Sequence, residues 1–325
     1  MMNSNVVMEM TGGDEIQFRK LHEEMSLGER MKMYEKAMER RIEEGNVFIV
    51  RLDGHSFSKF TKSMHQPWDS KFTAAMAMTA ADLLKEFQPT TAYVQSDEIS
   101  LTFFPIKSKN NDREWEPYIF NGRIQKIVSV MAGFASARFN HHLQQLISNP
   151  NQPEYRDPSI HILPTSSRSL NHYPLYDVLS CKDNGYEMHS AGRAHFDGRV
   201  AEFQHEHELY NCILWRTRDC FKNVVSKTAE KLVGNKACYK KNTQEKLAMI
   251  EEKDPGHMAT INPGVVDGIF VKKSLYHNEE GSIRSKSSFY AGPFSTKSET
   301  RREWDDFIKS KNTADCKLLR HINEL

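Results

Sequence analysis

Two acidic positions that follow apolar stretches constrain this chain more than any other feature. In residues 48–52, large apolar side chains alternate along a short stretch that ends at Asp53 and Gly54, as in a mostly buried strand that runs into a turn. Asp97 and Glu98 lie between two further apolar stretches. The pattern therefore predicts one strand and one hairpin, each with carboxylates at its tip.

A predicted helix separates the two acidic positions. Asp69 is typical of a helix N-cap, and apolar residues then recur at helical spacing to Phe87. If the strand and the hairpin lie side by side, Asp53 and Asp97 converge at one end of a sheet. Converging carboxylates repel each other and are tolerated when a hard cation such as Mg²⁺ lies between them, as in two-metal phosphoryl transfer. The alternative is a pair of solvated turn residues, which is favoured for either Asp alone but not for the pair in this order.

The order of the predicted elements indicates the fold class. Helices are expected over residues 27–42, 122–146 and 206–233, and a further strand over residues 195–203. Up to that strand the order is strand, helix, strand, strand, helix, strand, which is the order of ferredoxin-like folds and of a polymerase palm. We therefore expect an α+β protein with an antiparallel sheet, helices on one face of it, and a helical C-terminal part.

A chain of 325 residues is long enough for one large domain or two ordinary ones. We expect a flexible N-terminus over residues 1–24 and a catalytic palm over residues 25–204, with an irregular, proline-rich insertion at about residues 148–194. Residues 205–325 are expected to form a helical, basic, RNA-contacting region. Its later part is predicted to contain a strand, a basic serine-rich loop and a short helix, over residues 264–271, 272–302 and 301–311.

The composition is that of a soluble globular protein, with 38% hydrophobic and 27% charged residues. The five cysteines form no CxxC pair and are odd in number, which argues against a disulfide framework and favours a reduced, intracellular setting. No apolar run reaches the roughly 18–20 residues of a membrane span, and the polar N-terminus lacks a signal pattern. We therefore expect a cytoplasmic protein without a membrane partner.

The formal net charge of +1 does not mark the whole chain as a nucleic-acid-binding protein, so an RNA surface has to be local. The strongest local excess of Lys and Arg lies on residues 206–233 and just after them. Such runs are more often a solvated helix face. Arg123 and Lys126 start another helix, where cations oppose the helix dipole, so they either meet a phosphate or are solvated. HExxH and GxSxG motifs are absent, which disfavours zinc and serine-nucleophile enzymes.

Several segments together match a known family. They are residues 48–60 (FIVRLDGHSFSKF), 67–69, 93–103 (YVQSDEISLTF), 123–140, 196–200 (FDGRV) and 264–272, with Trp215, Arg216, Asp219 and Asn223. With these segments the chain resembles the tRNA-histidine guanylyltransferase superfamily, in particular its tRNA-histidine guanylyltransferase-like members. The Asp-Gly strand end followed by a helix and the Gln-Ser-Asp-Glu hairpin is the most specific part of the match.

The resemblance implies an enzyme that adds nucleotides to RNA 5′ ends, in the direction opposite to ordinary polymerases. In such enzymes a nucleoside triphosphate, ATP or GTP, activates a 5′-monophosphate, and the 3′-hydroxyl of an incoming nucleotide displaces the activating group. A 5′-triphosphate end can skip the activation. The implied partners are tRNA or tRNA-like RNA and nucleoside triphosphates, and the implied assembly is a homotetramer.

The resemblance also implies roles for individual residues. Two Mg²⁺ ions would be held by Asp53, the Gly54 carbonyl and Asp97, with Glu98 as the third catalytic carboxylate. The expected nucleotide contacts are the backbone amides of Gly54, His55, Ser56 and Phe57, together with Asp69, Ser96, Arg123 and Lys126. The expected RNA contacts are Arg216, Asn223, Lys227, Lys240 and Lys241.

The chain departs from the family pattern in three places. Authentic histidine-tRNA enzymes carry a His-Ile-Asn-Asn-Leu-Tyr-Asn motif, of which only Asn223 survives in residues 221–227. This favours template-dependent 5′-end repair over addition of G at position −1 of tRNA-His. Gln66 replaces a usual lysine, which bears on the choice of activating nucleotide, and residues 148–194 are longer than the usual connection. A palm-type nucleotide cyclase and a catalytically inactive RNA-binding module are the remaining alternatives.

Overall fold

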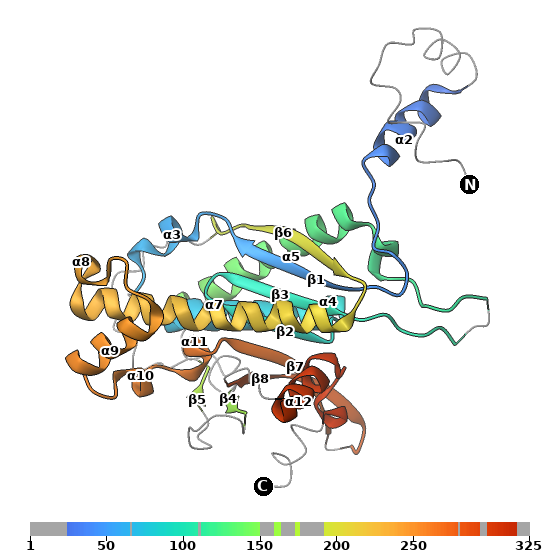
Figure 1. The fold of residues 1–325 in the computed structure, drawn as a ribbon. Coiled ribbons are helices and arrows are strands. Elements are labelled where there is room, and N and C mark those ends of the chain that lie inside the picture. The colour runs from blue at the N-terminus through green and yellow to red at the C-terminus, as the bar shows by residue number, and fades with distance from the viewer. Residues whose placement is uncertain are drawn as a thin grey trace.

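The computed structural model describes residues 25–65, 67–109, 112–149, 159–163, 173–175, 192–278, 280–292 and 298–316. One sheet runs through the centre of the molecule, with helices on both sides (Figure 1). Eight strands form it in the order β5-β4-β8-β7-β2-β3-β1-β6. In chain order the strands are β1 Val47–Gly54, β2 Thr91–Gln95, β3 Glu98–Phe103, β4 Ser159–Ile162, β5 Tyr173–Pro174, β6 Phe196–Phe203, β7 Ile269–His277 and β8 Ile283–Ala291.

The helices fall into long ones and short ones. The long helices are α2 Leu27–Ala37, α4 Ser70–Phe87, α5 Ile124–Ser148, α7 Glu206–Val233, α9 Thr243–Lys253 and α12 Ser298–Lys309. The short ones are α3 Phe57–Phe60, η3 Thr61–Ser63, η4 Ile119–Gly122, α8 Asn235–Cys238, α10 His257–Thr260, α11 Pro263–Val266 and η6 Thr313–Asp315. No helix in the part of the chain that the structure describes is long and apolar enough to cross a membrane.

The predicted palm is confirmed. β1, α4, β2, β3, α5 and β6 follow each other along the chain, and the pairs β2–β3, β3–β1 and β1–β6 are all antiparallel. The resulting order β2-β3-β1-β6 is that of the ferredoxin-like split βαβ fold. Asp69 caps α4 as expected, because its carboxylate accepts a hydrogen bond from the Phe72 amide at 2.9 Å.

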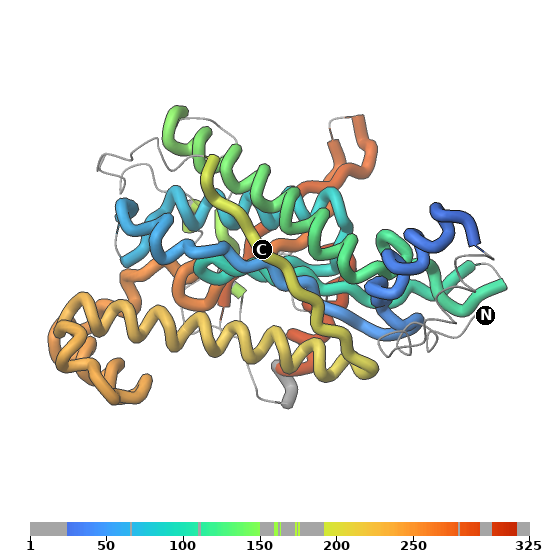
Figure 2. The backbone as a smooth tube through the Cα atoms, turned by 90° about the horizontal axis from the view of Figure 1, so that it is seen from above, coloured from blue at the N-terminus to red at the C-terminus, as the bar shows by residue number. Residues whose placement is uncertain are grey.

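The two faces of β1 serve two different cores. Phe48, Val50 and Leu52 are buried with the apolar residues of α4 and α5. Val47 and Ile49 belong to a second cluster with residues of α7 and α12. Helices therefore cover both faces, whereas the sequence predicts them on one, and Figure 2 shows α5 and α7 on opposite sides of the palm strands. Because side chains alternate along a strand, Asp53 faces the same side as Ile49, toward α7.

The C-terminal part differs from the sequence-based expectation. The segment predicted as a strand over residues 264–271 holds α11 and only the start of β7, and the predicted loop over residues 272–302 holds the rest of β7, β8 and the start of α12. β7 and β8 are buried where they cross the sheet and exposed toward their shared tip, where polar residues are mixed with Leu275, Tyr276 and Ile283. The exposed half of each strand shows too little regular alternation to be recognised from sequence.

The structure also bears on the N-terminal helix and the insertion that were predicted for the palm. The predicted helix over residues 27–42 ends at Ala37, and none of its residues is buried. The predicted insertion contributes β4, which pairs with β8, and β5 at the sheet edge, and the rest of it lies outside the described residues, as do residues 1–24. The division of the chain into palm and C-terminal region stays a prediction, although both contribute strands to the same sheet.

Candidate active site

Asp53 lies at the end of β1, in the most acidic part of the sheet. Its cross-strand partners are Glu98 on β3 and Asp197 on β6. Burial raises the pKa of Asp53, and repulsion from Asp97 and Asp197 raises it further, against the opposing effect of Arg199 and Arg51. The side chain keeps 36% of its surface exposed. Asp53 is thus a partly exposed carboxylate surrounded by more negative than positive charge.

Asp97 is held beside Asp53 by the backbone of both segments. It lies in the β2–β3 turn, after Ser96 at a φ of +48°, and its carbonyl accepts a hydrogen bond from the Gly54 amide at 3.0 Å. A Cβ on Gly54 would come within 2.5 Å of the Phe57 ring, so only glycine fits there. The predicted convergence of the strand end and the hairpin is therefore confirmed in the backbone.

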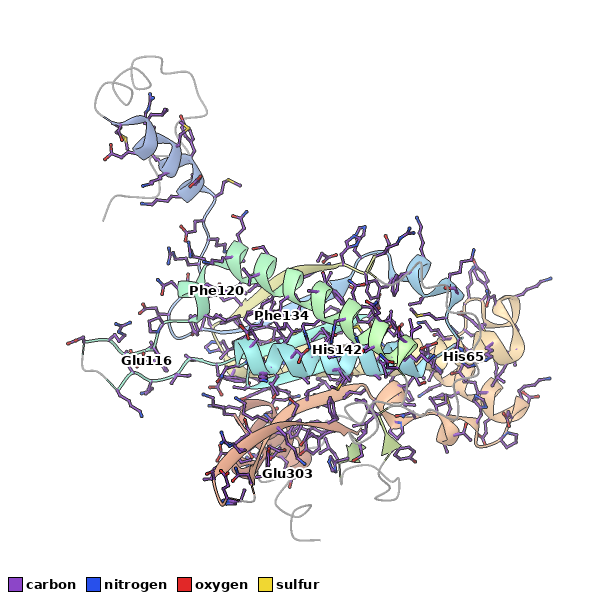
Figure 3. The ribbon with its side chains drawn as sticks, turned by 180° about the vertical axis from the view of Figure 1, so that it is seen from behind. His65, Glu116, Phe120, Phe134, His142 and Glu303 are labelled. Carbon is purple, nitrogen blue, oxygen red and sulfur yellow. The ribbon has the colours of Figure 1, made fainter. Side chains whose placement is uncertain are left out.

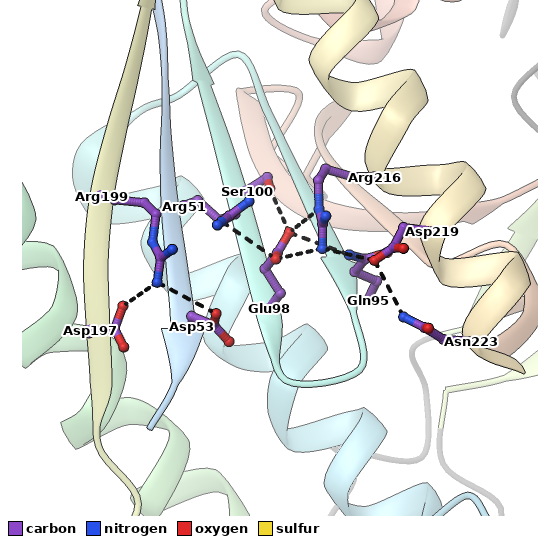
Figure 4. A network of polar contacts seen from close by, with 10 residues as sticks. All are labelled: Arg51, Asp53, Gln95, Glu98, Ser100, Asp197, Arg199, Arg216, Asp219 and Asn223. Atoms are coloured by element: carbon purple, nitrogen blue, oxygen red, sulfur yellow. Dashed lines mark hydrogen bonds and ion pairs between the residues drawn. The ribbon is translucent and has the colours of Figure 1, made fainter. Parts of the chain in front are cut away.

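Glu98 has a different environment from the other two predicted catalytic carboxylates. It is buried, and both of its oxygens accept hydrogen bonds from Arg216 on α7, at 2.7 and 2.8 Å (Figure 4). Arg51 lies 3.5 Å from Oε2. Burial raises the pKa of Glu98, and Arg216 opposes this rise. The contacts indicate that Glu98 positions α7 against the hairpin, and its catalytic role stays a prediction.

A cavity of about 460 Å³ opens beside the carboxylates. This volume lies within the range of roughly 300–1,000 Å³ that small-molecule sites occupy. It is enclosed by the tip of the β2–β3 hairpin, the segment between α3 and α4, α7 and α11. The lining residues of chemical interest are Asp53, Trp68, Asp69, Ser96, Asp97, Asn223 and Lys227.

Trp68, Gln95 and Lys227 contribute polar or charged groups to the cavity lining. Trp68 Nε1 and Gln95 Oε1 are buried and have no hydrogen-bond partner among the described residues. Lys227 Nζ lies 5.2 Å from the centre of the Trp68 ring, in cation–π contact. Asp69, by contrast, is occupied, because it also accepts a hydrogen bond from the His65 amide at 3.0 Å. Asp69 therefore shapes this loop, and Gln66 lies outside the described residues.

Two of the four predicted phosphate-binding amides are already used. The Gly54 amide donates to Asp97, and the His55 amide donates to the His195 carbonyl at 2.9 Å. Ser56, at a φ of +57°, and Phe57 begin α3, where backbone amides lack helical acceptors. The predicted cradle for a triphosphate is thereby reduced to Ser56 and Phe57.

Arg123 and Lys126 do not join this site. Arg123 lies next to Arg41, before the start of β1, and its Nε is 3.6 Å from Glu39; Lys126 covers the Phe120 ring. Figure 3 shows Phe120 and the cavity residue His65 at opposite ends of the molecule. Arg123 and Lys126 therefore do not line the cavity beside the carboxylates, because the start of α5 lies a strand length, about 20 Å, from the acidic end of β1. Their expected contacts with phosphates or a second nucleotide stay a prediction.

The predicted RNA contacts separate into three groups. Arg216 is buried against Glu98 and is not available to RNA, which corrects that prediction. Asn223 and Lys227 face the cavity. Lys240 and Lys241 are exposed beyond the end of α7, where Lys241 pairs with Glu245 at 2.9 Å.

Asp197 and Arg199 were not singled out as site residues from sequence. Arg199 Nη2 lies 3.1 Å from Asp197 Oδ1 and 3.8 Å from Asp53 Oδ2, so it links the two carboxylates (Figure 4). Both belong to the FDGRV segment on β6. The antiparallel register of β1 and β6 is the signal that places them beside Asp53, and the sequence alone does not give that register.

The donor set at this end of the sheet fits Mg²⁺ better than a softer metal. No three His, Cys, Asp or Glu residues of the described chain are grouped to hold an ion. Asp53 and Asp97 nevertheless offer carboxylate oxygens close to each other, and burial raises the pKa of Asp53, with repulsion from Asp97 adding to this rise. Mg²⁺ commonly takes one or two carboxylates and completes its shell with water and substrate phosphates.

Comparison with known proteins gives concordant matches. A family model described as tRNAHis guanylyltransferase (Thg1) matches residues 28–204. An uncharacterized protein of Acanthamoeba polyphaga mimivirus is 32% identical over 253 residues, which cover 77% of each chain.

Solved structures agree with the family match. A bacterial tRNA(His) guanylyltransferase (Thg1)-like protein in complex with ATP is 25% identical, has a TM-score of 0.59 and covers 87% of this chain and all of its own. The complex of such a bacterial protein with GTP gives 24% identity and the same TM-score, with 88% of this chain and all of the other covered. The tRNA(His) guanylyltransferase of Saccharomyces cerevisiae shares the fold at 16% identity and a TM-score of 0.51, with 73% and 90% covered.

Proposed function

Because this chain belongs to the tRNAHis guanylyltransferase (Thg1) family and is a nucleotidyltransferase, we propose that it extends the 5′ ends of tRNA in the 3′–5′ direction. The observation that carries the proposal is the open carboxylate end of a palm sheet next to a cavity of nucleotide size. We further propose that the addition is template-dependent and repairs truncated 5′ ends. Residues 221–227 support this, since the side chains of Phe221, Val224 and Val225 pack into hydrophobic clusters instead of presenting a polar recognition motif.

In the proposed reaction Asp53, the Gly54 carbonyl and Asp97 hold two Mg²⁺ ions. When bound, these ions would neutralise the triphosphate, activate the attacking oxygen and stabilise the leaving group. The amides of Ser56 and Phe57 donate to phosphate oxygens at the start of α3. Glu98 positions Asp97 and does not hold the ions itself, because its pairing with Arg216 fixes the hairpin that carries Asp97.

We propose that the activating nucleotide, ATP or GTP, binds in the cavity. A triphosphate near the carboxylates leaves the base in reach of Trp68, Lys227 and Asn223, which line the same space. A bacterial relative that covers most of this chain was solved in complex with ATP, which supports ATP as a ligand. The activated 5′-phosphate is then attacked by the 3′-hydroxyl of the incoming nucleotide, and the activating group leaves.

The proposal also covers the RNA contacts and the oligomeric state. We place RNA contacts on Asn223, Lys227, Lys240 and Lys241, all of which are exposed. Residues 205–325 thus form the RNA-contacting region of the proposed organisation. A homotetramer is the proposed assembly, and light scattering coupled to gel filtration measures it directly.

Addition of a single G at position −1 of tRNA-His is the second candidate. Asn223 is kept from the motif of such enzymes and is exposed on α7 at the cavity, which favours this alternative. The cyclase and inactive-module alternatives lose their support, because the chain belongs to a nucleotidyltransferase family and keeps Asp53 and Asp97.

The test is a 5′-extension assay on two matched RNAs. One is a tRNA that lacks its first nucleotides and carries a 5′-monophosphate; the other is a full-length tRNA-His. With Mg²⁺ and all nucleoside triphosphates, we expect the truncated tRNA to be extended only with bases complementary to its 3′ strand, and Asp97→Ala to be inactive. Addition of G to tRNA-His without a pairing base, and none to the truncated tRNA, would establish the second candidate instead.

A further inference from the structure

Trp215 is a large aromatic side chain on the surface of α7. It is 55% exposed, whereas Trp304 is fully buried in the core beneath α12. Trp215 is also absent from the lining of the nucleotide cavity, although its neighbour Arg216 belongs to it. Trp215 therefore belongs to neither the core nor the cavity lining, and its exposed ring is available for stacking.

Two guanidinium groups lie against the Trp215 ring. The Arg216 guanidinium is 4.6 Å from the ring centre and that of Arg51 is 6.0 Å away. Both arginines also contact Glu98, so their guanidinium groups are held in place beside the ring. A ring fixed in this way is pre-organised, because little side-chain freedom is lost when a second flat group stacks on it.

This ring lies close to the catalytic carboxylates. Arg51 is two residues before Asp53 on the same face of β1, which corresponds to about 6.6 Å along a strand. Arg199, the cross-strand partner of Arg51, is exposed and contacts Asp53. A base stacked on Trp215 would therefore lie near the carboxylate end of β1, on the side of the sheet that carries Arg51 and Arg199.

The surface beyond Trp215 continues as a basic stripe. Arg218 and Lys222 follow Trp215 by three and seven residues, so they lie on the same face of α7. Both are exposed. Neither forms an ion pair within the described residues, in contrast to Lys241. Positive charges at helical spacing next to an exposed aromatic ring are the pattern by which proteins hold a single nucleic-acid strand.

We propose that Trp215 is the stacking platform for a base at the 5′ end of the RNA substrate, and that Arg218 and Lys222 hold the phosphates of the same strand. The inference rests on the proposed function for its ligand class, RNA. It assigns the free nucleoside triphosphate to the cavity and the RNA end to Trp215. Stacking on an aromatic face tolerates every base, which suits an enzyme that must accept whichever base ends a truncated strand.

The test measures binding apart from chemistry, by tryptophan fluorescence in the absence of divalent cations. The probes are a 5′-monophosphorylated, 5′-truncated tRNA and, in a separate titration, ATP. The variants are Trp215→Phe and Trp215→Ala. The matched controls are Trp115→Phe and Trp115→Ala, since Trp115 also carries a cation, Lys107 Nζ at 5.6 Å, but lies before η4 at the opposite end of the sheet.

We expect RNA to quench the wild-type fluorescence and the quench to disappear in both Trp215 variants. Trp215→Ala should bind the tRNA about fivefold more weakly or worse, while Trp215→Phe keeps most of the affinity because it keeps a stacking face. ATP affinity and both Trp115 variants should stay at wild-type values. The proposal is overturned if Trp215→Ala binds tRNA like the wild type, if Trp115→Ala weakens it equally, or if ATP causes the Trp215 quench.

Failure of this inference and of the proposed function give different results. If the wild type extends no 5′ end but RNA binding still depends on Trp215, the proposed reaction is wrong and the platform stands. If extension proceeds while Trp215→Ala leaves both the RNA affinity and the KM for tRNA unchanged, the platform is wrong and the reaction stands.

Discussion

Asp53 and Glu98 are cross-strand partners on β1 and β3, yet their surroundings differ in exposure and in charge. The open carboxylate cluster of Asp53, Asp97 and Asp197 carries more negative than positive charge and is partly exposed. The buried ion pair of Glu98 and Arg216 has its charges balanced at 2.7 and 2.8 Å inside the protein. Unbalanced, accessible charge suits a site that binds cations and phosphates, whereas balanced, buried charge suits a fixed support. The comparison predicts that variants in the two regions fail in different ways.

The largest expected effect is on activity in the open cluster. Asp97→Asn should lower the rate of 5′ extension by about a thousandfold or more, because metal ions supply several kcal/mol of transition-state stabilisation. The free energy of unfolding should change little, because one of several repelling charges is removed. Extension assays and urea denaturation measure the two quantities.

Asp112→Asn is the control for this variant, since Asp112 is an exposed carboxylate between β3 and η4, away from the cluster. It should match the wild type in both assays. If the fall in the free energy of unfolding of Asp97→Asn were as large as the rise in its activation free energy, the cluster would be structural. The contrast between the two regions would then not hold.

The next effect is on stability, in the buried ion pair. Arg216→Ala should destabilise the protein by about 3–5 kcal/mol, because it leaves the Glu98 carboxylate buried without its partner. The double variant Glu98→Leu with Arg216→Met should recover much of this loss, because apolar groups of similar size can replace a buried pair. Urea denaturation gives both values. A loss below about 1 kcal/mol for Arg216→Ala, as at exposed pairs, would show that the pair is not a support.

Lys272 extends the comparison to a buried cation whose hydrogen bonds go to uncharged oxygens. Its Nζ donates to the Thr90 carbonyl, the Thr91 hydroxyl and the carbonyls of Phe307 and Ser310 at the end of α12. Burial lowers the pKa of Lys272 from 10.5 to about 7, although Cys316, Asp306 and Asp315 oppose this. Between these two values the folded state binds fewer protons than the unfolded chain, so stability from this residue rises with pH.

The wild type should therefore gain stability over Lys272→Met as the pH rises from about 7 to 9, by about 2 kcal/mol, and lose it again as the pH falls through 7. Denaturation curves across this range measure the difference. Lys273→Met is the control, because Lys273 is the next residue on β7 and is only partly buried. A constant difference between wild type and Lys272→Met would show that the amine stays charged, like Arg216.

The smallest effects are expected from changing the charged side chains around Asp53 in the open carboxylate cluster. Repulsion from Asp197 raises the pKa of Asp53, and Arg199 lowers it. Asp197→Asn should therefore move the acid limb of the Mg²⁺-dependent rate to lower pH, and Arg199→Ala should move it to higher pH, because Asp53 must be ionised to hold a cation. Exposed charges are screened by salt, so both shifts should shrink at high ionic strength. Shifts in the same direction would contradict the charge balance.

The sequence allowed a good prediction of the palm, because its strands and helices carry regular periodicity. α7 begins and ends at the predicted residues, and Asp69 caps α4 as expected. The sequence predicted only the start of β7 and did not predict β8, because the exposed half of each strand mixes polar and apolar residues without regular alternation. In the site, the approach of Asp97 to the strand end was predictable from a strand and a hairpin, whereas the position of Arg123 depended on the direction of α5 across the sheet.

The sequence by itself placed Asp53 at a strand end and Asp97 at a hairpin tip, because a carboxylate after an apolar stretch marks such an end whatever its neighbours are. It also determined the family, through the order of the Asp-Gly and Gln-Ser-Asp-Glu segments. Only the tertiary structure decided that Glu98 and Arg216 neutralise each other, that Asp197 joins Asp53, and that Trp215 stands exposed beside them. These features depend on strand register and on helix packing across the sheet, where residues that are far apart in the chain come into contact.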